Sequence, residues 1–286
     1  MTDTLYDAAL TVLNTACPHE KAEKTQAFAA RWFADDSLLI GQGDQLPERP
    51  ARPDKPELLH PSKMPKRLKG GSLRNKISLL HALAHIELNA IDLAWDIMAR
   101  FAHYAAENDK QGFSLPREFY SDWMKVASDE AKHFLMLSSR LSDLDAAYGD
   151  LPAHDGLWES ADRTAHDFAA RLAIVPMVLE ARGLDVTPHM ITSMKNQEDF
   201  ETADMLQIIH DDEITHVRAG TVWFEAWCEY HDKTVDETWQ DLVRTYFNGV
   251  LKKPFNHDSR EKAEMLRHWY EPLAEEMERL ATDGKL

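Results

Sequence analysis

A five-residue motif that occurs twice constrains the fold of this chain more than any other feature. Its two copies are Asp129-Glu130-Ala131-Lys132-His133 and Asp212-Glu213-Ile214-Thr215-His216. On an α-helix, a Glu and a His three residues apart lie on the same face about one turn apart, so both side chains can bind one metal ion. The repeat therefore predicts two helices that each carry a metal-binding face.

Both copies lie in segments with a helical pattern of apolar residues. Steps of three and four residues from the first Glu-His pair meet Trp123, Val126, Leu137, Leu141 and Leu144, and the same steps from the second meet Leu206, Ile209, Gly220, Trp223 and Trp227. The two pairs thus take positions on the buried side of amphipathic helices. A carboxylate there is normally paired or coordinates a metal ion, because an uncompensated buried charge is costly.

The pattern Glu-x-x-His alone is a weak signal, since roughly one copy is expected by chance in a chain of this composition. A third copy, Glu57-Leu58-Leu59-His60, lies in a proline-rich stretch without a helical pattern, and we interpret it as the chance instance. The preceding Asp, the repetition and the core-facing positions distinguish the other two copies.

Two further carboxylates complete a known arrangement. Di-metal sites in helix bundles use one Glu from each of two helices and a Glu-x-x-His from each of the other two. Glu87 lies on the apolar side of a predicted helix before the first motif, and Glu180 lies near the end of another before the second. Pro176, one turn before Glu180, is expected to kink or bulge that helix, and Gly183 is expected to end it. The predicted metal ligands are Glu87, Glu130, His133, Glu180, Glu213 and His216.

This order of ligands resembles the ferritin-like di-metal carboxylate superfamily. Four further segments are informative: His85-Ile86-Glu87-Leu88, Leu151-Pro152-Ala153-His154-Asp155-Gly156-Leu157-Trp158, Leu179-Glu180-Ala181-Arg182-Gly183-Leu184-Asp185 and Pro254-Phe255-Asn256. In these segments the chain looks like the ferritin-like family catalogued as domain of unknown function 455. The resemblance implies a ferritin-like four-helix bundle with a metal site, and it carries no assigned reaction.

The whole pattern predicts an all-α protein, because four long helices are expected and strand signals are missing. The long helices are expected over residues 73–107, 117–146, 157–182 and 198–231, with a short helical piece after Pro188. Two short helices, at 5–13 and 21–33, precede them, and two helical segments separated at Pro254 follow. We expect three parts: N-terminal helices and a strap in 1–71, a ferritin-like four-helix bundle in 72–231 and a C-terminal helical extension in 232–286.

Residues 46–71 differ from the rest in composition, with six prolines and seven basic residues. We interpret them as an extended strap that lies on the bundle. A strap that guides an anionic substrate or partner is the alternative, because a basic segment on an acidic protein attracts anions. Ser72, which follows Gly70-Gly71, is expected to cap the next helix.

The charge, the lengths of the apolar runs and the cysteine content of the chain exclude several classes of partner and of site. A formal net charge of −17 argues against nucleic acid or anionic lipid as a partner. No apolar run approaches the ~20 residues of a membrane span, and the N-terminus has no signal-peptide pattern. Cys17 and Cys228 are far apart in sequence, which excludes a disulfide framework and a cysteine zinc site. We expect a cytoplasmic protein with no membrane partner.

The Asp that precedes each ligand Glu is a candidate support. A metal-bound His usually donates its second ring N–H to a carboxylate, which fixes its tautomer. Asp129 and Asp212 are placed to serve the His of the opposite pair. The alternative is that both are solvated acids beside the buried face.

Four carboxylates and two imidazoles suit iron or manganese, and the missing thiolate disfavours zinc and copper(I). We expect two iron ions, with manganese or a mixed manganese and iron pair as alternatives. The leading hypothesis is an oxidase or oxygenase that uses O2 on a small organic substrate, with an electron-donor protein as a further partner. The alternatives are a ferroxidase or iron-handling protein, and a bundle whose metal only stabilises the fold. Assembly into a homodimer stays open.

Overall fold

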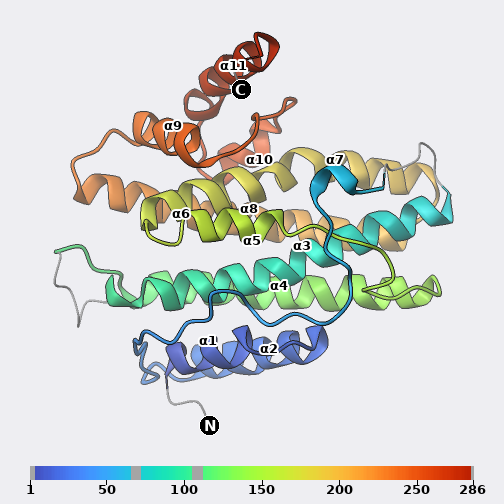
Figure 1. Ribbon diagram of the computed structural model, residues 1–286, viewed down its shortest axis with the longest axis horizontal. Coiled ribbons are helices and arrows are strands. Elements are labelled where there is room, and N and C mark those ends of the chain that lie inside the picture. Colours follow the sequence, from blue (N-terminus) through green and yellow to red (C-terminus); the bar gives the residue numbers. More distant parts are fainter. Residues whose placement is uncertain (1–3, 66–71, 105–111, 285–286) are drawn as a thin grey trace. The chain divides into compact units, whose positions relative to one another are not determined.

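The computed structural model describes residues 4–65, 72–104 and 112–284 (Figure 1). Within these ranges the secondary structure is helical, and the only strand-like pairings are two isolated bridges, Thr4 with Leu39 and Leu58 with Ala153. The prediction of an all-α protein is therefore confirmed. By its internal contacts the chain divides into two compact units, Met1–Glu159 and Ser160–Leu286. The three-part division expected from the sequence is a different one and stays a prediction.

The first unit is built around a pair of long helices. Helices α3 (Leu73–Arg100) and α4 (Arg117–Asp143) pack side by side, while α1 (Leu5–Leu13) packs on α3 and α2 (Pro18–Ala34) packs on α4 (Figure 1). Two short 3-10 turns, η1 (Pro61–Lys63) and η2 (Ala102–Tyr104), lie in the connections. Ser72 caps α3 as predicted, because its hydroxyl accepts the backbone N–H of Asn75.

The described part of the proline-rich segment, residues 46–65, has no helix apart from η1. Two of its basic side chains form ion pairs within the first unit: Arg49 with Asp155, and Arg52 with Asp92 of α3. These two ion pairs therefore hold the proline-rich segment against the first unit. Lys66, Arg67 and Lys69 lie outside the described residues.

The second unit contains most of the shorter helices. Its elements are α6 (Phe168–Ile174), a π-helical turn η4 (Val175–Glu180), α7 (Ala181–Asn196), α8 (Phe200–Tyr230), α9 (Val235–Tyr246), α10 (His257–Lys262) and α11 (Arg267–Thr282). Helix α5 (Gly156–Arg163) runs across the boundary between the units. Helix α8 is the central element, since α6, η4, α7, α9 and α10 all pack against it.

The prediction of one helix over residues 157–182 is correct at its start, and it is wrong in its middle and at its C-terminal end. The chain breaks after Arg163 and starts a new helix at Phe168, where the Asp167 side chain caps the N–H of Ala170. Further on, Gly183 does not end the helix, because α7 continues through it to Asn196. Pro188 also lies inside α7. Proline has no backbone N–H, so the helix loses one hydrogen bond there, and the packing of α7 along α8 offsets this loss.

Other boundaries shift by less. Helix α3 ends at Arg100 and α4 at Asp143, both earlier than predicted, and residues 105–107 lie outside the described residues. The C-terminal segment breaks around Pro254 as predicted, but a second break precedes Arg267, so it forms three helices.

Among the helices of the described residues, one, α3, is long and apolar enough to cross a membrane by length and composition alone. About 67% of its most apolar window is buried inside the structure. A core helix of a globular protein passes the same test, so this is weak evidence for a membrane span.

Candidate metal centre

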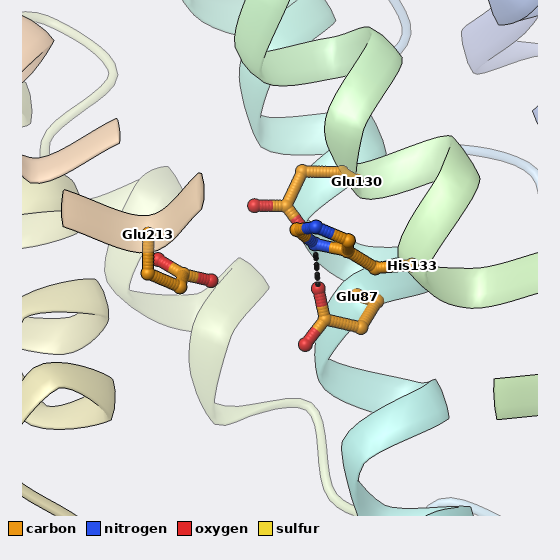
Figure 2. Close-up of side chains that lie close together, drawn as sticks. All are labelled: Glu87, Glu130, His133 and Glu213. Carbon is orange, nitrogen blue, oxygen red and sulfur yellow. Dashed lines mark hydrogen bonds and ion pairs between the residues drawn. The ribbon is translucent and has the colours of Figure 1, made fainter. Parts of the chain in front are cut away.

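The first unit brings three of the predicted ligands together. Glu87 comes from α3, and Glu130 and His133 come from α4. Nδ1 of His133 lies 3.1 Å from Oε2 of Glu87 and 3.8 Å from Oε2 of Glu130. Figure 2 shows the three side chains directed toward one another, with a dashed line between His133 and Glu87. One ligand atom from each lies within 4.8 Å of the others, so together they could hold a metal ion.

The sequence explains why α4 presents this face. The predicted stripe of Trp123, Val126, Leu137 and Leu141 is buried, and Glu130 and His133 are each 0% exposed within it. On α3, nearly every residue from Glu87 to Ala99 is buried, so Glu87 itself is only 2% exposed. The three polar ligands therefore lie in an apolar environment. We call Glu87, Glu130 and His133 the first half-site.

In the first half-site, burial and mutual repulsion make it unfavourable for Glu87 and Glu130 both to be ionised when no cation is bound. Burial is the largest cause that raises the pKa of Glu87 well above its ordinary value. The charge of Glu130 and a hydrogen bond with it raise that pKa further, while His133 acts in the opposite direction. A divalent cation at this point would replace the repulsion between the carboxylates with attraction to a common charge.

The second unit repeats the Glu-His geometry on α8. Nδ1 of His216 lies 3.6 Å from Oε2 of Glu213, close to the 3.8 Å of the matching pair in α4. His216 is 0% exposed and Glu213 is 8% exposed. The same ring nitrogen therefore faces the carboxylate in both copies. Figure 2 also draws the side chain of Glu213, which comes from α8.

Glu180 ends the π-helical turn η4, which confirms that Pro176 makes this segment irregular. The helix pair made by η4–α7 and α8 is antiparallel, because only the short turn at residues 197–199 joins α7 to α8. Within this pair Pro176 lies against Gly220. Glu180 lies four residues after Pro176, and His216 lies four residues before Gly220, so this contact is within four residues of both predicted ligands. We call Glu180, Glu213 and His216 the second half-site.

Comparison with known proteins assigns the chain to a family. Residues 14–271 match the family described as "Protein of unknown function (DUF455)". The chain belongs to this family. An uncharacterised protein of Haemophilus influenzae is 36% identical over 264 residues, which cover 90% of this chain and 89% of the relative. No solved structure matches the chain. The prediction of the DUF455 family from the sequence segments is therefore confirmed, and its ferritin-like character stays a prediction.

Asp129 of this DUF455 protein lies among lysines of its own helix. Its carboxylate forms ion pairs with Lys125 and with Lys132, the latter at 3.2 Å, and it is 5% exposed. Asp212 is half-buried on α8. The role of either Asp beside the His of the opposite pair stays a prediction.

Near the first half-site the structure shows a buried charge network that was missed at the sequence level. Asp92, five residues after Glu87, is 0% exposed and forms ion pairs with Lys21 of α2 and with Arg52, the latter at 2.7 Å. Arg52 also donates to the side-chain carbonyl of Asn89 at 2.6 Å. The sequence did contain a signal for this network: Asp92 lies in the most apolar part of α3, and a buried carboxylate there needs a cation beside it. We call Lys21, Arg52 and Asp92 the buried triad.

His85 and Tyr148 form a second buried contact of the DUF455 chain. His85 ring Nε2 lies 3.0 Å from the backbone carbonyl of His154 and 3.2 Å from the side-chain amide nitrogen of Asn89. Its Nδ1 lies 2.9 Å from the hydroxyl of Tyr148. Burial lowers the pKa of His85 to about 4, so the ring is neutral near pH 7. This network ties α3 to the loop that follows α4.

Proposed function

We propose that the two half-sites combine into one centre for two metal ions, in a ferritin-like four-helix bundle formed by α3, α4, η4–α7 and α8. The proposed activity is the oxidation of a small organic substrate by O2. The observation that carries the proposal is the first half-site, where Glu87 of one helix lies opposite His133 of a Glu-x-x-His, together with the same Glu-His geometry repeated on α8. Such a repeat is the arrangement that holds two ions in bundles of this class.

The chemistry of the donor set fits this group. Together the half-sites supply four carboxylates and two imidazoles, which are hard and borderline ligands suited to iron or manganese. Four carboxylates carry the charge that neutralises two divalent ions. The burial of Glu87, Glu130 and Glu213 also favours this use, since carboxylates in an apolar environment are stable only when a cation or a proton compensates them.

When bound, a reduced pair of iron ions would supply the electrons that O2 needs. The residues of the chain would bind the ions through the carboxylates and through Nδ1 of both His residues. A hydroxylation would take one oxygen atom of O2 into the product and reduce the other to water, with two electrons and two protons from a reductant. An electron-donor protein is therefore part of the proposal.

Metal content is the first test of this function. We expect about two ions per chain in protein purified from cells supplied with iron and manganese. Glu130→Ala and His216→Ala are each expected to lose metal while circular dichroism stays helical. Glu118→Ala is the matched control, because Glu118 is exposed on the same helix as Glu130. Retention of two ions in both variants would contradict the ligand assignment.

Exposure of the Fe²⁺-loaded chain to O2 distinguishes the reactions. Consumption of O2 with product formed from a supplied substrate and a reductant supports the oxidase or oxygenase. Stoichiometric oxidation of Fe²⁺ with no organic product would assign iron handling instead. Two bound ions without any O2 uptake would leave only a stabilising role for the metal.

A further inference from the structure

Gly220 of α8 and Pro176 of η4 are in unusually close contact. A β-carbon with ideal geometry at Gly220 would lie 2.4 Å from Cγ and 2.5 Å from Cβ of Pro176. Real β-carbons do not approach other atoms that closely. The ring of Pro176 is rigid and joined to the backbone, so it cannot turn aside as a flexible side chain would. Only glycine at position 220 therefore allows this packing of η4 on α8.

Glycine in the interior of a helix needs a reason, because it lowers helix stability relative to alanine. Helix α8 continues for ten residues beyond Gly220, so this glycine is not a helix end. The contact with the Pro176 ring, which is itself buried, supplies the reason.

The contact bears directly on the second half-site. His216 lies four residues before Gly220, on the same face of α8. Glu180 lies four residues after Pro176, at the end of the π-helical turn. Because the two segments are antiparallel, the point where Pro176 meets Gly220 determines how far along α8, and how close to it, Glu180 lies.

The first half-site is built differently at the matching positions. Counting one turn from Glu87 and His133 gives Leu83 and Leu137, and α3 passes through Glu87 as an uninterrupted α-helix. Ordinary side chains thus occupy the places that Pro176 and Gly220 take in the second unit. The irregular turn and its glycine are particular to the helix that carries Glu180.

We propose that Gly220 is a positioning residue of the second half-site: by admitting the Pro176 ring, it holds the π-helical turn that presents Glu180 beside His216. This role rests on the proposed di-metal function. It assigns Gly220 no contact with the ions, and it makes the binding of the second ion depend on a residue that cannot itself be a ligand.

The test compares two alanine variants. Gly220→Ala places a β-carbon into the Pro176 ring, whereas Gly183→Ala, in α7, places one where no atom lies within 4 Å. We expect Gly183→Ala to keep two ions with wild-type affinity. Gly220→Ala is expected to keep its helical circular dichroism and to bind the second ion at least ~10-fold more weakly, the loss typical when a supporting contact of a metal site is removed. Titration with Mn²⁺ alone measures both, without any activity assay.

A purely structural role for Gly220 would lower the melting temperature and leave the affinity for Mn²⁺ unchanged in the folded chain, and that result would overturn the proposal. If Gly220→Ala does not fold, Pro176→Ala tests the same role, because this substitution removes the ring that packs on Gly220 and adds no new contact. A weaker second ion in that variant supports the role, and wild-type affinity overturns it. A wild-type chain that binds no Mn²⁺ overturns the proposed function as well, so the two failures differ.

Discussion

Nδ1 of His133 lies 3.1 Å from a carboxylate oxygen of Glu87 on the neighbouring helix. The same nitrogen faces Glu130 at 3.8 Å, so one imidazole lies between two buried carboxylates. Burial and the charge of Glu130 both raise the pKa of Glu87. Without a cation, repulsion between Glu87 and Glu130 therefore destabilises the first half-site. A bound ion should attract both carboxylates, so that each of them then stabilises the chain.

Glu130→Gln tests this reversal. Without metal, the substitution removes one of two opposed buried carboxylates, whose mutual effect raises the pKa of Glu87, and it should therefore stabilise the chain. With metal, it removes a charged ligand and should destabilise the chain. Urea unfolding with a chelator and with Mn²⁺ measures both effects. Glu118→Gln, on the exposed face of α4, should change neither. A shift of the same sign in both conditions would contradict the metal assignment.

Asp92→Asn should destabilise the first unit strongly. The substitution leaves Lys21 and Arg52 of the buried triad without their anion, and breaking a buried ion pair typically costs ~3–5 kcal/mol. Glu275→Ala is the control, because Glu275 faces Lys253 at 3.8 Å on an exposed surface and should change stability by less than ~1 kcal/mol. The midpoint of urea unfolding measures both. Equal effects of the two substitutions would show that the triad contributes little.

His81 should make stability depend on pH in the weakly acidic range. It is 1% exposed, and its Nε2 accepts the backbone N–H of Gly149 at 2.9 Å, which requires a neutral ring. Burial lowers its pKa below the ordinary value of 6.5. The folded state then takes up this proton less readily than the unfolded state. The stabilisation is complete above pH 6.5 and is lost as the pH falls below it.

The measurement is the unfolding free energy as a function of pH, for the wild type and for His81→Gln. One proton contributes a slope of at most ~1.4 kcal/mol per pH unit. The variant has no titrating ring at this position and should show a shallower slope below about pH 6.5. Parallel curves for the two proteins would exclude His81 as the cause.

The two cysteines should differ sharply in reactivity. Cys228 is 0% exposed on α8, and burial raises its pKa to about 12, whereas Cys17 is exposed at the start of α2. Because the thiolate is the reactive form, an aromatic disulfide reagent at neutral pH should label Cys17 quickly and Cys228 only on unfolding. Cys17→Ser should then show no fast labelling and one thiol in denaturant. Fast labelling of that variant would mean that α8 opens readily.

Much of the helical layout could be predicted from periodicity. The buried stripe of α4 occupies the expected positions from Trp123 to Leu141, because a regular helix repeats its faces at a constant spacing. On α8 the prediction holds as far as Gly220, and then the buried positions shift from Trp223 and Trp227 to Phe224 and Cys228. Which side of a helix is buried beyond that point depends on neighbours such as α9, and no local pattern records those contacts.

Gly183 and Pro188 show the limit of local signals. Both residue types commonly end helices, yet α7 continues through them, because its packing along α8 outweighs their weak helix propensity. Pro176 was interpreted correctly, since a proline inside a helix must disturb the hydrogen bonds around it. The partner that accommodates it, Gly220, lies 44 residues away in the sequence (220 − 176).

The sequence by itself determined that each Glu-x-x-His pair shares a helix face, because three residues are always close to one turn. It also determined the family and the all-α class, through segments and periodicities that are local in the chain. Only the tertiary structure decided that Glu87 meets His133, that Asp92 is held by Lys21 and Arg52, and that Pro176 lies against Gly220. Each of these contacts joins residues far apart in the chain, and its geometry depends on how whole helices pack.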